Sequence, residues 1–176
     1  MSQRPSGYER VKNDLYETPE WVTRAVIPHL GDSWYIWEPA CGNGKISNVL
    51  KEQYTVRESD ITRGQDFFHY ENTEAEVILT NPPYNQATEF VEHALKLTEP
   101  NQGKVILLLR TDFDHAKNRR HLFADNRVFA KKVILTKRIV WFEDKKANPS
   151  YNHAWFIWDW KNKDTPTLAW HFEDRK

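Results

Sequence analysis

The segment Asn81-Pro82-Pro83-Tyr84 follows a short apolar run and carries the strongest chemical signal in the chain. Its two prolines fix φ at about −65°, lack backbone N–H donors and push the preceding residues out of the helical region. We expect a rigid loop in which the Asn81 side-chain oxygen and the Pro82 carbonyl accept both hydrogens of one amino group. Such acceptance frees the nitrogen lone pair for attack, and Tyr84 can stack on the ring that bears the amino group. A proline-rich turn that only caps the next helix is the less favoured interpretation.

A second segment of interest, Glu38–Gly44, also follows an apolar run. Gly42 and Gly44 allow a tight turn and a close approach of the backbone to a ligand. Glu38 is suited to a cationic or amino-bearing ligand. The third glycine of a dinucleotide-binding motif is missing, so a pyrophosphate ligand is not favoured. Taken alone, this segment is explained equally well as a plain tight turn.

Two carboxylates further along the chain fit a nucleoside ligand. Asp60 could accept hydrogen bonds from both hydroxyls of a ribose, as acidic residues do in dinucleotide-binding folds. Asp66 could accept from an adenine amino group while the ring of Phe67 or Phe68 flanks the base. The simpler interpretations are a solvated loop charge for Asp60 and a helix or turn cap for Asp66.

Alternating strands and helices must position these segments. Apolar patterns predict strands at 34–37, 54–58, 77–79 and 105–109, and helices at 19–30, 45–53, 86–97 and 115–124. Thr18 is the expected N-cap of the first helix, with Pro19 at its first position. Two further runs, 133–142 and 154–160, predict an antiparallel pair at one edge. The alternation indicates an α/β fold with a mostly parallel sheet, helices on both faces, and a ligand site beyond the carboxyl ends of the strands.

Three motifs resemble those of class I S-adenosylmethionine-dependent methyltransferases. Glu38-Pro39-Ala40-Cys41-Gly42-Asn43-Gly44 resembles their cofactor motif, and Tyr16-Glu17-Thr18-Pro19 resembles the N-terminal cofactor motif that precedes it. Asn81-Pro82-Pro83-Tyr84 resembles the catalytic motif of amino-group methyltransferases, especially DNA adenine-N6 enzymes. The resemblance covers about residues 14–160. In size the chain is similar to small phage or prophage enzymes, which lack a separate target-recognition domain.

This resemblance implies a Rossmann-like class I methyltransferase fold with an antiparallel C-terminal edge strand, S-adenosyl-L-methionine as cofactor, and direct in-line methyl transfer to a flipped base. The catalytic residues that it implies are Asn81, Pro82, Pro83 and Tyr84. The cofactor-binding residues that it implies are Tyr16, Thr18, Glu38, Pro39, Ala40, Gly42, Gly44, Asp60, Asp66, Phe67 and Asn81. Neither a metal nor a covalent enzyme intermediate is needed, and Cys41 is not a nucleophile, which disfavours carbon-5 methylation of cytosine. Asp112, Asp114 and His115 are interpreted as solvated polar residues rather than metal ligands.

Charge is unevenly distributed along a chain whose net charge is zero. Residues 110–146 hold eleven Lys/Arg and five Asp/Glu, which makes this segment +6 and the remainder −6. A basic segment indicates a surface that faces phosphates, with a solvated helix face as the alternative. Arg119, Arg120 and His121 form its densest cluster, which is expected on the binding side. The predicted substrate-binding residues are Tyr84, Arg119, Arg120, Lys145, Lys146, Tyr151 and His153, with Tyr151 or His153 as a second ring stacked on the base.

Composition restricts the remaining choices. The single cysteine, Cys41, excludes an internal disulfide and a Cys-based zinc site and favours a reducing compartment. The polar N-terminus and the lack of a run of ~20 apolar residues predict a cytoplasmic protein without a membrane segment. We expect a flexible arm at 1–15 and a single catalytic domain at 16–176. The high aromatic content is assigned mainly to the core and partly to base stacking.

Several functions remain open at this level. The predicted partner is nucleic acid, DNA above all, but the motifs also suit an RNA or N4-cytosine amino-methyltransferase. A protein-glutamine enzyme would be expected to carry an additional N-terminal helical domain. A non-catalytic nucleic-acid-binding module on the same fold is disfavoured, because such a module needs neither Asn81 nor Asp60. The lack of a target-recognition domain leaves a homodimer as an option.

Overall fold

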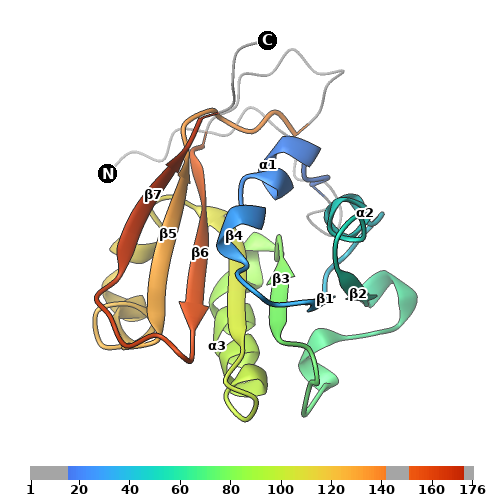
Figure 1. Ribbon diagram of the computed structural model, residues 1–176, viewed down its shortest axis with the longest axis horizontal. Helices are drawn as coiled ribbons and strands as arrows, with labels where there is room; N and C mark the ends of the chain where they lie inside the picture. The colour runs from blue at the N-terminus through green and yellow to red at the C-terminus, as the bar shows by residue number, and fades with distance from the viewer. Residues whose placement is uncertain (1–15, 142–150, 173–176) are drawn as a thin grey trace.

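The strands of this protein form one sheet with the order β2-β1-β3-β4-β6-β5-β7. The structure is a computed structural model that describes residues 16–141 and 151–172 (Figure 1). The strands are β1 (Tyr35–Glu38), β2 (Thr55–Glu58), β3 (Val77–Thr80), β4 (Lys104–Arg110), β5 (Phe129–Leu135), β6 (His153–Asp159) and β7 (Thr167–His171). All pairs between these described strands are parallel except β4–β6 and β5–β6. This arrangement confirms the predicted α/β class and its mostly parallel sheet.

Helices cover both faces of the sheet, as predicted. The α-helices are α1 (Glu20–Arg24), α2 (Lys45–Leu50) and α3 (Ala87–Thr98). Figure 1 shows α3 on the opposite side of the sheet from α1. Short 3₁₀ turns, labelled η, are η2 (Ile27–His29), η3 (Ile61–Arg63), η4 (Phe67–His69), η5 (Tyr84–Gln86), η6 (Phe113–His115) and η7 (Lys117–Leu122). None of the helices in the described ranges is long and apolar enough to cross a membrane.

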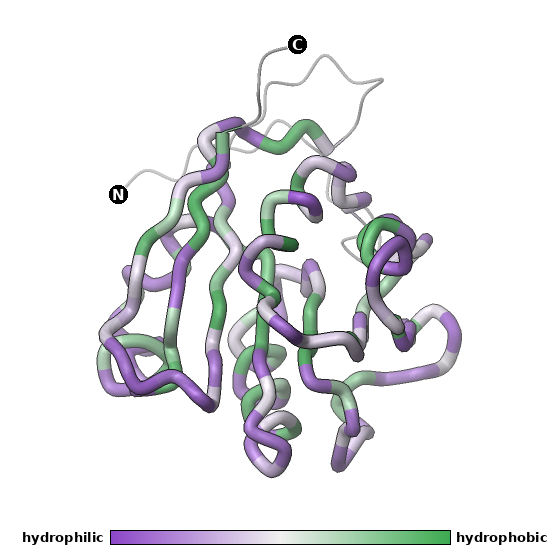
Figure 2. The backbone as a smooth tube through the Cα atoms, viewed as in Figure 1, coloured by the Kyte–Doolittle hydropathy of each residue, from purple (hydrophilic) through white to green (hydrophobic). Residues whose placement is uncertain are grey.

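The core has two layers because successive side chains of a strand point to opposite faces. In the central strand β4, Val105, Leu107 and Leu109 belong to the layer that packs on α3. Ile106 and Leu108 belong to the layer that packs on α1 and α2. A strand that is buried on both faces has an uninterrupted run of apolar residues, so the position of β4 could be predicted from the sequence. Figure 2 shows this as hydrophobic colouring along the central strands.

The antiparallel strand is β6, and it lies inside the sheet between β4 and β5. The C-terminal edge is instead β7, which pairs with β5 in parallel and was not predicted. Leu168 and Trp170 of β7 are exposed, so this strand lacks the buried face by which strands are recognised. The strand β5 also begins earlier than predicted, since it includes the buried Lys132, whose ammonium group binds Asp114 at 2.9 Å.

Two predicted helices need correction. Thr18 does not cap the first helix: Pro19 occupies the N-cap position with extended backbone angles, and no side chain makes a capping bond there. The α-helix ends at Arg24 and continues as the η2 turn, whose second residue, Pro28, cannot donate to the helix. The segment 115–124 is also not an α-helix, because η6 and η7 are successive 3₁₀ turns separated at Ala116, which has an extended conformation.

Trp155 offers a test of how the sheet is joined to α1. This fully buried residue of β6 donates its indole N–H to the Val22 carbonyl of α1 at 2.8 Å. We expect Trp155→Phe to lower the free energy of unfolding by about 2–3 kcal/mol, because it leaves a small cavity and an unpaired buried carbonyl. Urea denaturation measures this change.

The matched control is Trp170→Phe in β7, where the indole is 55% exposed. It should change stability by no more than about 0.5 kcal/mol. Equal losses in the two variants would contradict the role given to the Trp155–Val22 bond.

Candidate functional site

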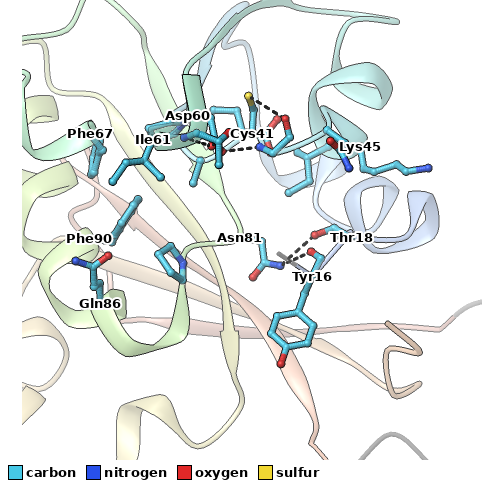
Figure 3. Close-up of a pocket in the computed structure, with 18 of the residues that line it drawn as sticks. Tyr16, Thr18, Cys41, Lys45, Asp60, Ile61, Phe67, Asn81, Gln86 and Phe90 are labelled. Carbon is cyan, nitrogen blue, oxygen red and sulfur yellow. Dashed lines mark hydrogen bonds between the residues drawn. The ribbon is translucent and has the colours of Figure 1, made fainter. Parts of the chain in front are cut away.

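A pocket lies beyond the carboxyl ends of β1, β2 and β3, where ligands bind in parallel sheets (Figure 3). Its walls come from four separate segments of the chain. The predicted cofactor residues that line it are Tyr16, Thr18, Glu38, Pro39, Ala40, Gly42, Asp60, Asp66, Phe67 and Asn81. Gly44 lies just outside the lining. Of the predicted catalytic residues, Asn81 and Pro83 line the pocket, whereas Pro82 and Tyr84 do not.

The loop after β1 turns on two glycines. Gly42 and Gly44 have φ values of 49° and 79°, in the left-handed region that glycine tolerates best. The Gly44 amide donates to the Cys41 carbonyl at 2.7 Å, which closes the turn before α2 begins. A side chain at position 44 would also approach the Glu58 carboxylate to 3.2 Å. The requirement for glycine is therefore one of backbone conformation as well as space.

Asp60 fastens this loop to the next one. Its Oδ2 accepts from the Gly42 amide at 2.7 Å, and its Oδ1 accepts from the Thr62 amide at 2.8 Å and the Thr62 hydroxyl at 2.6 Å. A carboxylate has about four acceptor positions, so one position on Oδ2 remains. The expectation that Asp60 accepts from ribose hydroxyls stays a prediction, and this position on Oδ2 is the one available to it. Burial raises the pKa of Asp60, but the bonds from Thr62 and Gly42 and the Arg63 cation outweigh it and lower the pKa overall.

Glu38, at the end of β1, is another carboxyl group that lines this pocket. It is 1% exposed, and the Ser47 hydroxyl donates a hydrogen bond to its Oε2. Burial raises the pKa of Glu38 to about 8, the nearby carboxylates Glu58 and Asp60 add to the increase, and the Ser47 bond opposes it. At neutral pH this group is therefore mainly an uncharged carboxylic acid.

Apolar side chains form the opposite wall. Phe67 is buried between Trp37 and Phe90, and Asp66 accepts from the Phe68 amide at 3.0 Å, as a turn cap does. The sequence analysis did not assign Ile61, Gln86 and Phe90 to the pocket, although all three line it. Ile61 is 65% exposed, and an apolar side chain directly after Asp60 was the available signal. Phe90 belongs to the core-facing side of α3 and stacks on Phe67.

Asn81 lies against the N-terminal segment. Its Nδ2 donates to the Tyr16 carbonyl at 3.4 Å and to the Thr18 hydroxyl at 3.2 Å. A carbonyl can only accept, so the Tyr16 contact determines which end of the amide is nitrogen. The Oδ1 atom points away from both residues and is buried with no hydrogen-bond partner among the described residues (Figure 3). The predicted acceptor of an amino group is therefore present and unused.

Tyr84 follows the two prolines and begins η5. Its hydroxyl is 3.0 Å from His153 Nε2, and its ring packs on that of Tyr16 with centroids 5.9 Å apart. His153 is 2% exposed, so it has no open ring face for a base, which corrects the stacking role expected of it. Tyr151 lies beneath the Arg110 guanidinium, 4.0 Å from the ring centroid.

The basic cluster is directed elsewhere than predicted. Arg120 pairs with Asp125 at 2.9 Å, His121 with Glu92 at 2.7 Å, and the Arg119 side chain donates to the Phe113 carbonyl at 2.6 Å. After this cluster the chain approaches the amino end of β4. The Leu122 carbonyl accepts a hydrogen bond from the Trp158 indole, and Trp158 pairs with Val105 near the start of β4. None of these residues lines the pocket. Lys145 and Lys146 lie outside the described residues.

No group of three or more metal-ligating side chains occurs in the described part of the chain. Asp112 pairs with Arg110 at 2.7 Å and Asp114 with Lys132 at 2.9 Å. Both carboxylates are therefore parts of ion pairs.

No family model and no curated protein matches this sequence. Solved structures do resemble it at low identity. A proposed RNA methyltransferase from Pyrococcus horikoshii matches with a TM-score of 0.62 and 14% identity over 89% of this chain and 92% of the other. A proposed class I S-adenosylmethionine-dependent methyltransferase from Listeria monocytogenes gives 0.57 and 15%, over 86% and 62%. The type I restriction-modification methyltransferase subunit from Streptococcus thermophilus gives 0.53 and 12%, over 82% and 43%.

These likenesses establish the fold, which is that of class I methyltransferases. This chain spans less than two thirds of the length of the Listeria and Streptococcus proteins.

The role of Asp60 can be tested by Asp60→Asn. The amide nitrogen of the new asparagine would face a backbone N–H, either that of Gly42 or that of Thr62, and two donors cannot bond to each other. We therefore expect the free energy of unfolding to fall by about 2 kcal/mol at pH 7. The folded pKa lies below the ordinary 3.8, so stabilisation by the carboxylate is complete above that value and is lost as the pH falls through the folded pKa. The difference between the two proteins should therefore shrink in acid, as measured by urea denaturation.

Asp32→Asn, at an exposed position, is the control and should match the wild type. A deficit in Asp60→Asn that stays constant into strong acid would contradict the electrostatic explanation.

Proposed function

We propose that this protein transfers the methyl group of S-adenosylmethionine to an exocyclic amino group, and that adenine N6 in DNA is its target. The observation that carries this proposal is the buried Oδ1 of Asn81 at the pocket, for which no described residue is a hydrogen-bond partner. A buried acceptor without a partner costs about 1–3 kcal/mol, so an amino group that donates to it is bound favourably. Its orientation is held by Thr18 and Tyr16 before any substrate arrives.

The lining of the pocket fits the proposed cofactor. The remaining acceptor position of Asp60 suits a ribose hydroxyl, Asp66 can accept from an adenine amino group, and Ile61 and Phe90 offer apolar surface to the purine. Glu38 lies where it can lose its proton beside a cation. When bound, S-adenosylmethionine supplies an electrophilic methyl group.

In this proposal the protein acts by positioning and electrostatics. Asn81 Oδ1 and the Pro82 carbonyl accept the two amino hydrogens, which directs the nitrogen lone pair toward the methyl carbon. The amino nitrogen would accept the methyl group that S-adenosylmethionine supplies when bound, and it would release a proton to water. Pro82 is buried, and both prolines have restricted φ angles. These two features keep Asn81 Oδ1 and the Pro82 carbonyl in place.

Basic residues at the carboxyl edge of the sheet support a polyanionic substrate. Arg110 ends β4, and Lys137 and Arg138 follow the parallel strand β5, so all three lie at the edge that holds the pocket. The Streptococcus thermophilus structure is named as a restriction-modification subunit and the Pyrococcus horikoshii structure as a proposed RNA methyltransferase. The resemblance of Asn81–Tyr84 to adenine-N6 enzymes favours DNA, and RNA is the alternative.

The proposal is tested by transfer of labelled methyl from S-adenosylmethionine to duplex DNA, single-stranded DNA and RNA, with digestion and mass analysis of the nucleosides. We expect N6-methyladenine in DNA. Asn81→Ala should lower kcat by about 10²–10³, the loss typical of removing one positioned transition-state contact.

The matched control is Asn85→Ala, which alters an exposed asparagine of the same loop and should retain activity. Methyl transfer to RNA alone would move the assignment to RNA. Cofactor binding without transfer to any nucleic acid would overturn the proposed substrate class.

A separate prediction concerns pH and cofactor affinity. The cofactor carries a sulfonium cation, so its binding should lower the pKa of Glu38 from about 8 and release a proton at neutral pH. Affinity should therefore rise between pH 6 and 8 and level off above pH 8. Isothermal titration calorimetry in buffers of different ionisation enthalpy measures both quantities.

Glu38→Gln should bind with little dependence on pH and with no proton release. Glu17→Gln, which alters a more exposed carboxylate of the same pocket, should release the proton as the wild type does. Equal release from Glu38→Gln would show that another group titrates.

A further inference from the structure

The loop Asn81–Tyr84 is rigid in its backbone but not in its last side chain. Pro82 and Pro83 have restricted φ values, and Pro83 is extended at φ −59° and ψ 127° immediately before η5. Neither proline restricts rotation of the Tyr84 ring about its side-chain bonds. If Tyr84 is to hold a base at a defined angle to Asn81, another group must determine the plane of its ring.

His153 is placed to do this. It is the first residue of β6 and pairs with Arg110, the last residue of β4, so it is fixed at the carboxyl edge by the sheet. Its Nε2 is 3.0 Å from the Tyr84 hydroxyl. The Trp141 ring packs edge-on against the imidazole, with centroids 5.2 Å apart and an interplanar angle of 85°.

We infer that His153 is a positioning residue that acts through Tyr84, holding the tyrosine ring in the plane on which the target base stacks. This inference rests on the proposed function and deepens it, since it assigns to a residue buried behind the site a role in orienting the substrate. His153 touches neither substrate nor cofactor in this arrangement.

The charge state of the imidazole suits this role. Burial and, to a smaller extent, the Arg110 cation lower the pKa of His153 to about 4, although the Tyr151 backbone and Asp112 act in the opposite direction. The ring is therefore neutral at physiological pH. A phenol both donates and accepts, so the bond to Tyr84 forms with either tautomer of the neutral imidazole.

The effect should be on kcat more than on binding. A base can still stack on a rotated ring, but its amino group then approaches the methyl carbon at the wrong angle, and small misplacements lower rates steeply. The cofactor pocket contains neither Tyr84 nor His153, so cofactor affinity should be unaffected.

The experiment is a double-mutant cycle in the full-length protein, with wild type, Tyr84→Phe, His153→Phe and the double variant. Each single change keeps an aromatic ring and removes the hydrogen bond. Each should lower kcat for adenine methylation about tenfold, with KM for DNA changed less than about twofold and the dissociation constant for S-adenosylmethionine unchanged. The double variant should be no slower than the slower single variant.

His153→Gln provides the rescue, because its amide can reach a position close to that of Nε2 and restore much of kcat. If His153→Phe fails to fold, Tyr84→Phe and His153→Gln carry the test. The inference would be overturned if the single variants kept the kcat of the wild type, or if the kcat of the double variant fell by the product of the two single losses. In either case, methylation by the wild type would still uphold the proposed function. Failure of the wild type to methylate any nucleic acid would overturn the proposed function and this inference together.

Discussion

The hydrogen bond between the Gly42 amide and the Asp60 carboxylate joins the loops that follow β1 and β2, and the shape of the pocket depends on it. These strands are parallel neighbours in register from Tyr35 to Glu38, so their loops leave the sheet side by side. Gly42 can turn into this bond only because glycine tolerates its positive φ. Arg63 strengthens the junction by donating to the Gly42 carbonyl at 3.0 Å. Acidic and glycine residues at these positions are thus needed for the form of the loops before any ligand is considered.

The other side of the pocket is closed by contacts between residues far apart in the sequence. The Asn81 amide nitrogen binds the N-terminal segment through Thr18 and Tyr16, and the Tyr16 ring packs between those of Tyr84 and Trp141. With the nitrogen satisfied in this way, the oxygen has no partner in the described part of the chain, although most buried polar groups in proteins have one. The contacts of the nitrogen thus determine the orientation of the amide and leave its oxygen available to a donor.

Sequence patterns were informative wherever the cause of the structure is local. Uninterrupted apolar runs identified β3 and β4, and glycine and proline identified the loops that follow β1 and β3. Sequence patterns failed where a long-range contact determines the structure. Lys132 is tolerated within a strand because Asp114 pairs with it. The strand β7 has no buried face of its own and is held by its pairing with β5. The site shows the same division. The motifs located the pocket, but the occupation of Asp60 by Thr62 and the burial of His153 behind Tyr84 depend on side chains that meet only in the folded chain.

Two carboxyl groups in one pocket have pKa values shifted in opposite directions, and their neighbours explain why. Asp60 receives hydrogen bonds from two backbone amides and a hydroxyl and lies near Arg63, so its ionised form is favoured despite burial. Glu38 is more deeply buried, receives a bond from the Ser47 hydroxyl alone among the described side chains, and lies near two other carboxylates. Ionising it would add a poorly solvated negative charge beside existing ones. The charge of Asp60 therefore maintains the loops of the pocket, whereas the ionisation of Glu38 depends on the charge of whatever binds there.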